Sequence, residues 1–148
     1  MRNIILLDVD NTLADSFWRD EMIGIAHWDD YHAKGMEDLP APDFVPFILH
    51  YANNPHYELI GITARPEKWR NLTMRWLSTH GIRLDDLWMR KDNDFRTDHE
   101  VKLSLCEEKL GVDWRERILL IIDDNDRVIE AFKAENITCL QIFNRRRV

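Results

Sequence analysis

The sequence predicts an α/β domain with a Rossmann-like core, in which helices cover both faces of a parallel sheet. Two observations lead to this prediction. Short, unbroken apolar runs of strand length recur along the chain, and stretches with helical periodicity separate them. Strands that are buried on both faces read as unbroken apolar runs, and parallel neighbours need crossover connections that are usually helical. The 148 residues are expected to form one domain, 1–148.

Five segments have the length and composition of buried strands. They are residues 4–7, 57–62, 87–89, 118–122 and 138–142. The segments between them carry the helical signals. Apolar residues recur at the spacing of one helical face over 44–51, 69–77 and 128–132. Thr97 and Glu100 fit a capping box that opens a further helix, and Gly111 is placed to end it.

The least regular part of the chain lies between the first two predicted strands, within residues 15–56. It is rich in aromatic residues, among them Trp18 and Trp28, and it follows directly after a pair of aspartates. We interpret 15–42 as a small helical or loop cap over a site, in which these two tryptophans could stack on a base. The alternative is an ordinary surface connection that is packed by its own aromatic side chains.

Composition limits the classes of function. The net charge of −7 argues against broad, sequence-independent coating of nucleic acid, although it allows a local basic groove. No apolar run approaches the ~18 residues of a membrane span, and the N-terminus has no signal-peptide pattern. The two cysteines make no disulfide framework, which favours a reducing cytoplasm. Residues 145–147 form a basic tail that we interpret as a solvated terminus.

Polar residues stand at the ends of three predicted strands. Asp8 and Asp10 follow the first strand, Thr63 follows the second, and Asp123 and Asp124 follow the fourth. Ligands of open parallel sheets bind beyond the carboxyl ends of the strands, so we expect these side chains to converge. Clustered carboxylates repel one another unless a cation lies between them. Hard oxygen ligands without a convincing histidine or cysteine set favour Mg²⁺ over zinc.

Such a cluster suits phosphoryl chemistry. One carboxylate would attack phosphorus and form an acyl phosphate, and a second would protonate the leaving oxygen and then activate water. Thr63 could hydrogen-bond a phosphate oxygen, and Lys102 would supply positive charge. The expected Mg²⁺ ligands are Asp8, Asp123 or Asp124, and Asp10 through its carbonyl. Each feature alone is common in turns, helix caps and solvated helices, so only their combination is informative.

The combination resembles the haloacid dehalogenase (HAD) superfamily of phosphotransferases over the whole chain. The segment 8–13, Asp-Val-Asp-Asn-Thr-Leu, resembles its first motif, with Asp8 as nucleophile and Asp10 as general acid/base. Asn11 stands where glycine is commoner, and asparagine also accepts left-handed backbone angles. Thr63 and Lys102 match the second and third motifs, and Asp123-Asp124 matches the fourth.

Residues 61–143 resemble more narrowly the 3′-phosphatase domain of phage polynucleotide kinases. The segments 61–67, 89–96 and 122–128 carry this likeness. The resemblance implies that Arg65 and Arg90 contact a substrate phosphate, a role that suits the planar arginine fork. The chain has no Walker-type P-loop, so no kinase half is expected.

Four functions remain open on the sequence, one of which is a phosphotransferase that uses an aspartyl-phosphate. The expected reaction is hydrolysis of a phosphomonoester at the 3′ end of DNA or RNA, and the first alternative is a nucleotidase that acts on free nucleotides. An alternative of another class is a noncatalytic protein that binds phosphate or metal in the same pocket. Asp10 and Lys102 argue against pure binding, because binding needs no acid/base. The expected partner is therefore a phosphorylated nucleic-acid end or a nucleotide.

Overall fold

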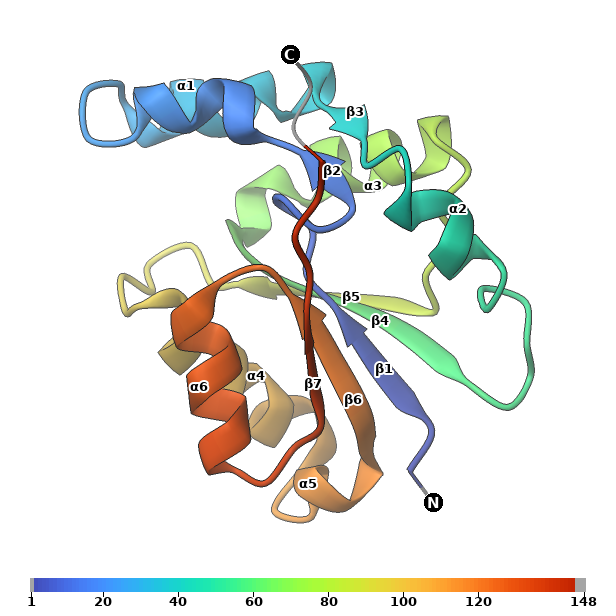
Figure 1. Cartoon of the computed structure of the whole chain (residues 1–148). Helices are drawn as coiled ribbons and strands as arrows, with labels where there is room; N and C mark the ends of the chain where they lie inside the picture. Colours follow the sequence, from blue (N-terminus) through green and yellow to red (C-terminus); the bar gives the residue numbers. More distant parts are fainter. Residues whose placement is uncertain (1, 146–148) are drawn as a thin grey trace.

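A computed structural model of the chain describes residues 2–145; Arg146 and Arg147 of the basic tail lie outside the described residues. Its main sheet has five strands in the order β5-β4-β1-β6-β7 (Figure 1). Every neighbouring pair in this sheet is parallel, as predicted. The strands are β1 (Ile4–Leu7), β4 (Glu58–Pro66), β5 (Asp86–Arg90), β6 (Ile118–Asp123) and β7 (Cys139–Gln141).

Helices cover both faces of the sheet, as the unbroken apolar strands predicted. Strand β1 shows why: Ile5 and Leu7 pack into one buried cluster, and Ile4 and Leu6 pack into another. The first cluster includes apolar side chains of α2 (Phe44–Leu49) and α3 (Arg70–Thr79). The second includes those of α4 (Asp98–Leu110) and α6 (Asp126–Ala134), and the short α5 (Trp114–Arg117) adds to it. Figure 1 shows the two helix pairs on opposite sides of the strands.

The end of β4 differs from its predicted end at residue 62. The strand continues to Pro66, and a short 3₁₀ helix, η3 (Glu67–Trp69), precedes α3. The strand is longer because Pro66 pairs with Arg90 of β5 across an irregularity in the register. Such a pairing depends on the neighbouring strand, so the periodicity of the segment itself does not reveal it. The capping box that opens α4 and the glycine that ends it are both present.

The aromatic-rich segment lies beyond the carboxyl ends of the main strands (Figure 1). A two-stranded antiparallel ribbon of β2 (Ala14–Asp15) and β3 (Leu39–Pro40) holds its ends together. Between these strands lie η1 (Phe17–Met22), α1 (Trp28–Ala33) and η2 (Lys34–Glu37). Helix α2 comes after the ribbon and packs into the core. Within the described part of the chain, no helix is long and apolar enough to span a bilayer.

Candidate active site

Asp8 stands directly after β1 and is held in place from several sides. Its amide donates to the Ile122 carbonyl at 3.0 Å, and the Thr12 hydroxyl donates to its Oδ2 at 2.9 Å. The chain turns sharply after it because Asn11 adopts a left-handed φ of 62°. Asn144, from the far end of the chain, donates its side-chain amide to the Asn11 and Thr12 carbonyls at 2.8 and 2.9 Å. Asn144 was not expected from the sequence, because it comes close to this turn only in the folded chain.

Lys102 joins two of the strand ends. Its ammonium donates to Asp8 Oδ1 at 2.8 Å and to Asp123 Oδ2 at 2.6 Å, and all three side chains are buried. The capping box fixes the start of α4, so Lys102 reaches the site from the first turns of a well-anchored helix. Thr63 is completely buried in the neighbouring strand β4, three residues before its end, and its hydroxyl accepts from the Arg65 amide at 3.1 Å.

Three carboxylates surround one point at this edge of the sheet. Oxygens of Asp8, Asp123 and Asp124 all lie within 4.8 Å of one another. Burial and the charge of Asp123 raise the pKa of Asp8 well above its ordinary value, although Lys102 opposes them. The same two causes raise the pKa of Asp124 to about 6. Three ionised carboxylates and one ammonium leave two negative charges, so the oxygen set fits a divalent cation such as Mg²⁺.

The Asp10 carboxylate points away from this cluster toward two arginines. Arg65 donates to it twice, from Nε at 3.0 Å and from Nη2 at 2.7 Å. Arg19 Nη2 adds a third bond at 2.8 Å, and the Ser16 hydroxyl a fourth at 2.9 Å. Burial alone would raise the pKa of Asp10, but the arginine charges outweigh it and hold the pKa well below its ordinary range. The side chain of Asp10 is therefore outside the metal cluster, and only its backbone carbonyl could serve as a ligand.

Arg19 and Asp38 form a buried ion pair that sequence reasoning missed. Arg19 is completely buried, and its Nε and Nη2 donate to the two Asp38 oxygens at 2.9 and 2.7 Å. Its Nη1 donates to the Tyr31 carbonyl at 3.0 Å, and its guanidinium lies 4.4 Å from the centre of the Tyr31 ring. Trp18, a stacking candidate, donates its indole N–H to Asp38 at 2.8 Å. The segment after β1 is thus tied to the Asp10 carboxylate by charge.

Replacing Arg19 by methionine should destabilise the fold strongly. Methionine fills similar space, but Asp38 and Asp10 would lose a cation in a buried setting. Breaking a buried pair by removing one partner costs about 3–5 kcal/mol. Urea unfolding of the variant checks this. The matched control is Arg115→Met, which breaks the more exposed pair with Glu135 and should cost less than about 1 kcal/mol. Equal losses in the two variants would contradict a structural role for the Arg19–Asp38 pair.

The two arginines expected to contact substrate are both engaged within the protein. Besides Asp10, Arg65 also donates from Nη1 to the Thr73 hydroxyl at 3.2 Å. Arg90 donates from Nε to the Ala64 carbonyl at 2.8 Å and from Nη2 to Asp98 at 2.8 Å. Its Nη1 donates to two carbonyls of the loop that follows β5, those of residues 94 and 96. Arg65 therefore lies against the acid/base candidate, whereas Arg90 joins that loop to the end of β4.

Together, the fold and the site define the class of protein. One end of a parallel sheet carries Asp-x-Asp, a threonine and an aspartate pair, and helix α4 adds a lysine; the structure brings Asp8, Lys102, Asp123 and Asp124 together there. This arrangement is that of a HAD-type phosphatase domain. The sequence profile described as the polynucleotide kinase PNKP phosphatase domain matches residues 2–145. The chain belongs to this family.

Solved structures agree with this assignment. The structure of the Pnkp1/Rnl/Hen1 RNA repair complex contains a similar chain, with a TM-score of 0.80 and 25% identity over 97% of this chain and 43% of that one. A second structure of that complex gives the same values with 46% coverage of its chain, so this protein spans less than half the length of either relative.

More distant structures share the fold. A predicted phosphatase from Clostridium acetobutylicum has a TM-score of 0.68 at 16% identity, over 95% of this chain and 84% of that one. A HAD-superfamily hydrolase from Geobacter sulfurreducens has a TM-score of 0.61 at 11% identity, over 95% and 86%. At these identities the likeness concerns the fold alone. No curated protein sequence matches the chain.

Proposed function

We propose that this protein is a magnesium-dependent polynucleotide 3′-phosphatase that works through an aspartyl-phosphate on Asp8. The observation that supports the reaction is the Lys102 bridge between Asp8 and Asp123, which fixes a carboxylate beside a cation and within a cluster of carboxylates that could hold a metal ion. The match to the PNKP phosphatase domain over nearly the whole chain supports a nucleic-acid end as substrate. The segment 15–42 would act as the cap that closes over this end.

In the first step, an Asp8 oxygen attacks the phosphorus. The bond between phosphorus and the 3′ oxygen of the sugar breaks, and that oxygen takes a proton from Asp10. Lys102 holds the attacking carboxylate in position and offsets charge on the transferred group. In the second step, the Asp10 carboxylate removes a proton from water, and the resulting hydroxide attacks the phosphorus of the acyl phosphate. Asp8 is released and inorganic phosphate is formed.

The pairing of Asp10 with Arg65 bears on the first step. As long as Arg65 and Arg19 both donate to it, Asp10 is ionised and has no proton to give. A phosphate dianion that binds beside Arg65 would compete with Asp10 for the charge and the N–H groups of the guanidinium. The pKa of Asp10 would then rise toward its ordinary value. Arg65 would then contact both the substrate phosphate, as predicted, and Asp10.

Asp8, Asp123 and Asp124 would hold the Mg²⁺ ion with the Asp10 carbonyl. When bound, the ion supplies positive charge that neutralises the carboxylates and polarises the phosphoryl group. The buried Lys102 contributes part of the same charge, but it cannot alone neutralise three carboxylates.

Phosphate release from four kinds of substrate tests the proposal. With Mg²⁺, a 3′-phosphorylated oligonucleotide should be hydrolysed faster than its 5′-phosphorylated isomer and faster than 3′- or 5′-mononucleotides. Exhaustive chelation should abolish release, and added Mg²⁺ should restore it. DNA and RNA versions of the oligonucleotide would identify the preferred sugar. If free 5′-nucleotides are far better substrates than any oligonucleotide, the protein is a nucleotidase and only the aspartyl-phosphate chemistry remains.

A further inference from the structure

The loop between β5 and α4, residues 91–97, carries an aromatic side chain that the fold does not use. Phe95 is 90% exposed, the highest value among the large apolar side chains of the described residues. Exposed aromatic rings are costly in water, and they are enriched where a protein meets a partner or ligand. Figure 1 shows the loop at the left edge of the molecule, at the level of the strand ends.

Hydrogen bonds and an ion pair hold the loop without any contribution from Phe95. Arg90 donates to the carbonyls of residues 94 and 96 from below, and Asp94 accepts from the Arg96 side chain at 3.0 and 2.7 Å. The beginning of the loop is joined to the segment around Thr63, the second motif. The Lys68 amide donates to Asp92 at 2.8 Å, and Arg90 donates to the Ala64 carbonyl, next to Thr63. A ring on a loop that is tied in this way costs less loop entropy on binding than a ring on an untied loop.

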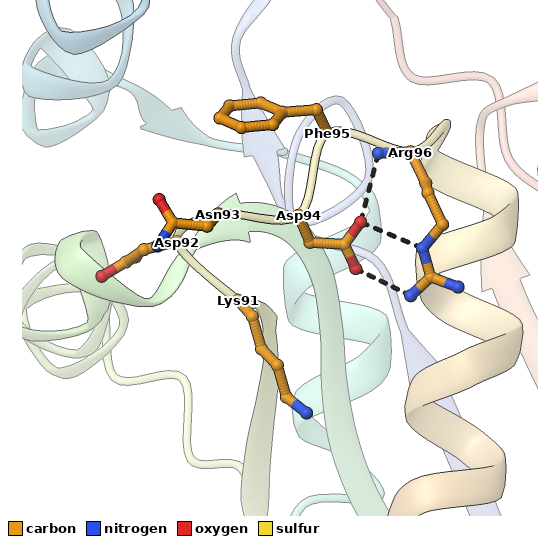
Figure 2. A pocket seen from close by; sticks show the side chains of 6 residues that line it. All are labelled: Lys91, Asp92, Asn93, Asp94, Phe95 and Arg96. Atoms are coloured by element: carbon orange, nitrogen blue, oxygen red, sulfur yellow. Dashed lines mark hydrogen bonds and ion pairs between the residues drawn. The ribbon is translucent and has the colours of Figure 1, made fainter.

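A shallow cavity of about 690 Å³ lies over the loop and is lined by residues 91–96. In Figure 2 the Phe95 ring extends to the side on which Asp92 and Asn93 lie, whereas the ion pair of Asp94 and Arg96 occupies the other side. The cations of the loop are occupied, since Arg96 pairs with Asp94 and Lys91 pairs with Glu108 at 3.1 Å. The cavity therefore offers an aromatic face and the Asn93 amide, rather than free positive charge.

We propose that Phe95 is a stacking platform for a nucleobase at the 3′ end of the substrate strand, and that it contributes to substrate binding. This inference rests on the proposed function, because it names the part of a nucleic-acid end that lies beside the transferred phosphate. Aromatic stacking accepts any base, so the platform would bind ends of every sequence. It would also favour an oligonucleotide end whose terminal base is present over one that lacks it.

The test combines Phe95→Ala with removal of the base. Two 3′-phosphorylated oligonucleotides are compared, one with a normal terminal nucleotide and one with an abasic sugar at the same position. With the normal substrate, Phe95→Ala should raise KM about 5-fold or more and leave kcat nearly unchanged, as expected for loss of a stacked base. Removal of the base should raise the KM of the wild-type enzyme similarly. The two changes together should cost no more than either alone.

Two further variants complete the test. Phe95→Trp should restore a low KM, because indole offers a larger stacking face, and Val112→Ala should behave as wild type because this exposed residue lies beyond the opposite end of α4. The stacking proposal would be wrong if wild type and Phe95→Ala had equal KM values on the normal substrate. It would also be wrong if the KM increases caused by Phe95→Ala and by removal of the base multiplied. Neither result would contradict the proposed function. A wild-type enzyme that does not hydrolyse 3′-phosphorylated oligonucleotides would overturn the proposed function and the platform with it.

Discussion

Asp8→Asn should reduce phosphatase turnover by at least about 10⁴-fold, since loss of a nucleophile removes the covalent route. The amide has the shape of the carboxylate; its oxygen can still accept from Lys102 and its NH₂ group can donate to the Thr12 hydroxyl, so the turn after β1 should be retained. Burial and the charge of Asp123 make ionised Asp8 unfavourable in the folded state, so the neutral amide should not lower the melting temperature. Release of phosphate from an oligonucleotide 3′-phosphate and thermal unfolding measure the two expectations.

A matched variant separates chemistry from general damage. Asp113→Asn makes the same change at an exposed position before α5, far from the carboxylate cluster. It should leave both turnover and unfolding unchanged. Turnover of Asp8→Asn within tenfold of the wild type would exclude Asp8 as nucleophile, whatever its position in the fold.

Asp10→Asn should slow turnover by about 10²- to 10⁴-fold, the usual contribution of a positioned general acid/base. Its effect should depend on the leaving group. An aryl phosphate expels a phenolate that needs little protonation, so Asp8 can still be phosphorylated. The aspartyl-phosphate then persists, because the amide cannot take a proton from the attacking water. We therefore expect a burst of phenolate, stoichiometric with enzyme, followed by slow turnover.

The oligonucleotide substrate should behave differently. Its leaving group is an alkoxide, which departs poorly without a proton, so the first step itself should become slow and no burst should appear. Rapid-quench measurements on both substrates with Asp10→Asn would show this contrast. Steady turnover of the aryl phosphate without a burst, at a rate near that of the wild type, would contradict the role of Asp10 as acid and base.

Much of the fold followed from local pattern. The runs at 4–7 and 118–122 coincide with β1 and β6 to within one residue, because a strand buried on both faces must be apolar throughout. The start of α4 was equally predictable, since Thr97 and Glu100 satisfy each other within one turn. The grouping of Asp8, Asp123 and Asp124 also followed, because the ends of neighbouring parallel strands meet at one edge.

The surroundings of Asp10 did not follow from the sequence. Arg19 and Asp38 are 19 residues apart in an irregular segment, and nothing in their local pattern distinguishes them from solvated charges. They come together only because the β2–β3 ribbon closes that segment over the strand ends. Asn144 likewise reaches the first motif from 132 and 133 residues away. Contacts of this kind depend on how elements pack, and not on the order of residue types.

For Arg65 and Arg90, too, the sequence and the folded chain gave different parts of the answer. In the sequence, Arg65 and Arg90 follow the second strand and the predicted strand 87–89, and the resemblance to the polynucleotide 3′-phosphatases implied that they contact a substrate phosphate. What each guanidinium touches became known from the folded chain: Arg65 binds the Asp10 carboxylate, and Arg90 holds the loop that carries Phe95. The physical reason is that periodicity and caps act within a few residues. The partner of a buried charge, by contrast, is chosen by whichever groups the fold removes from water beside it.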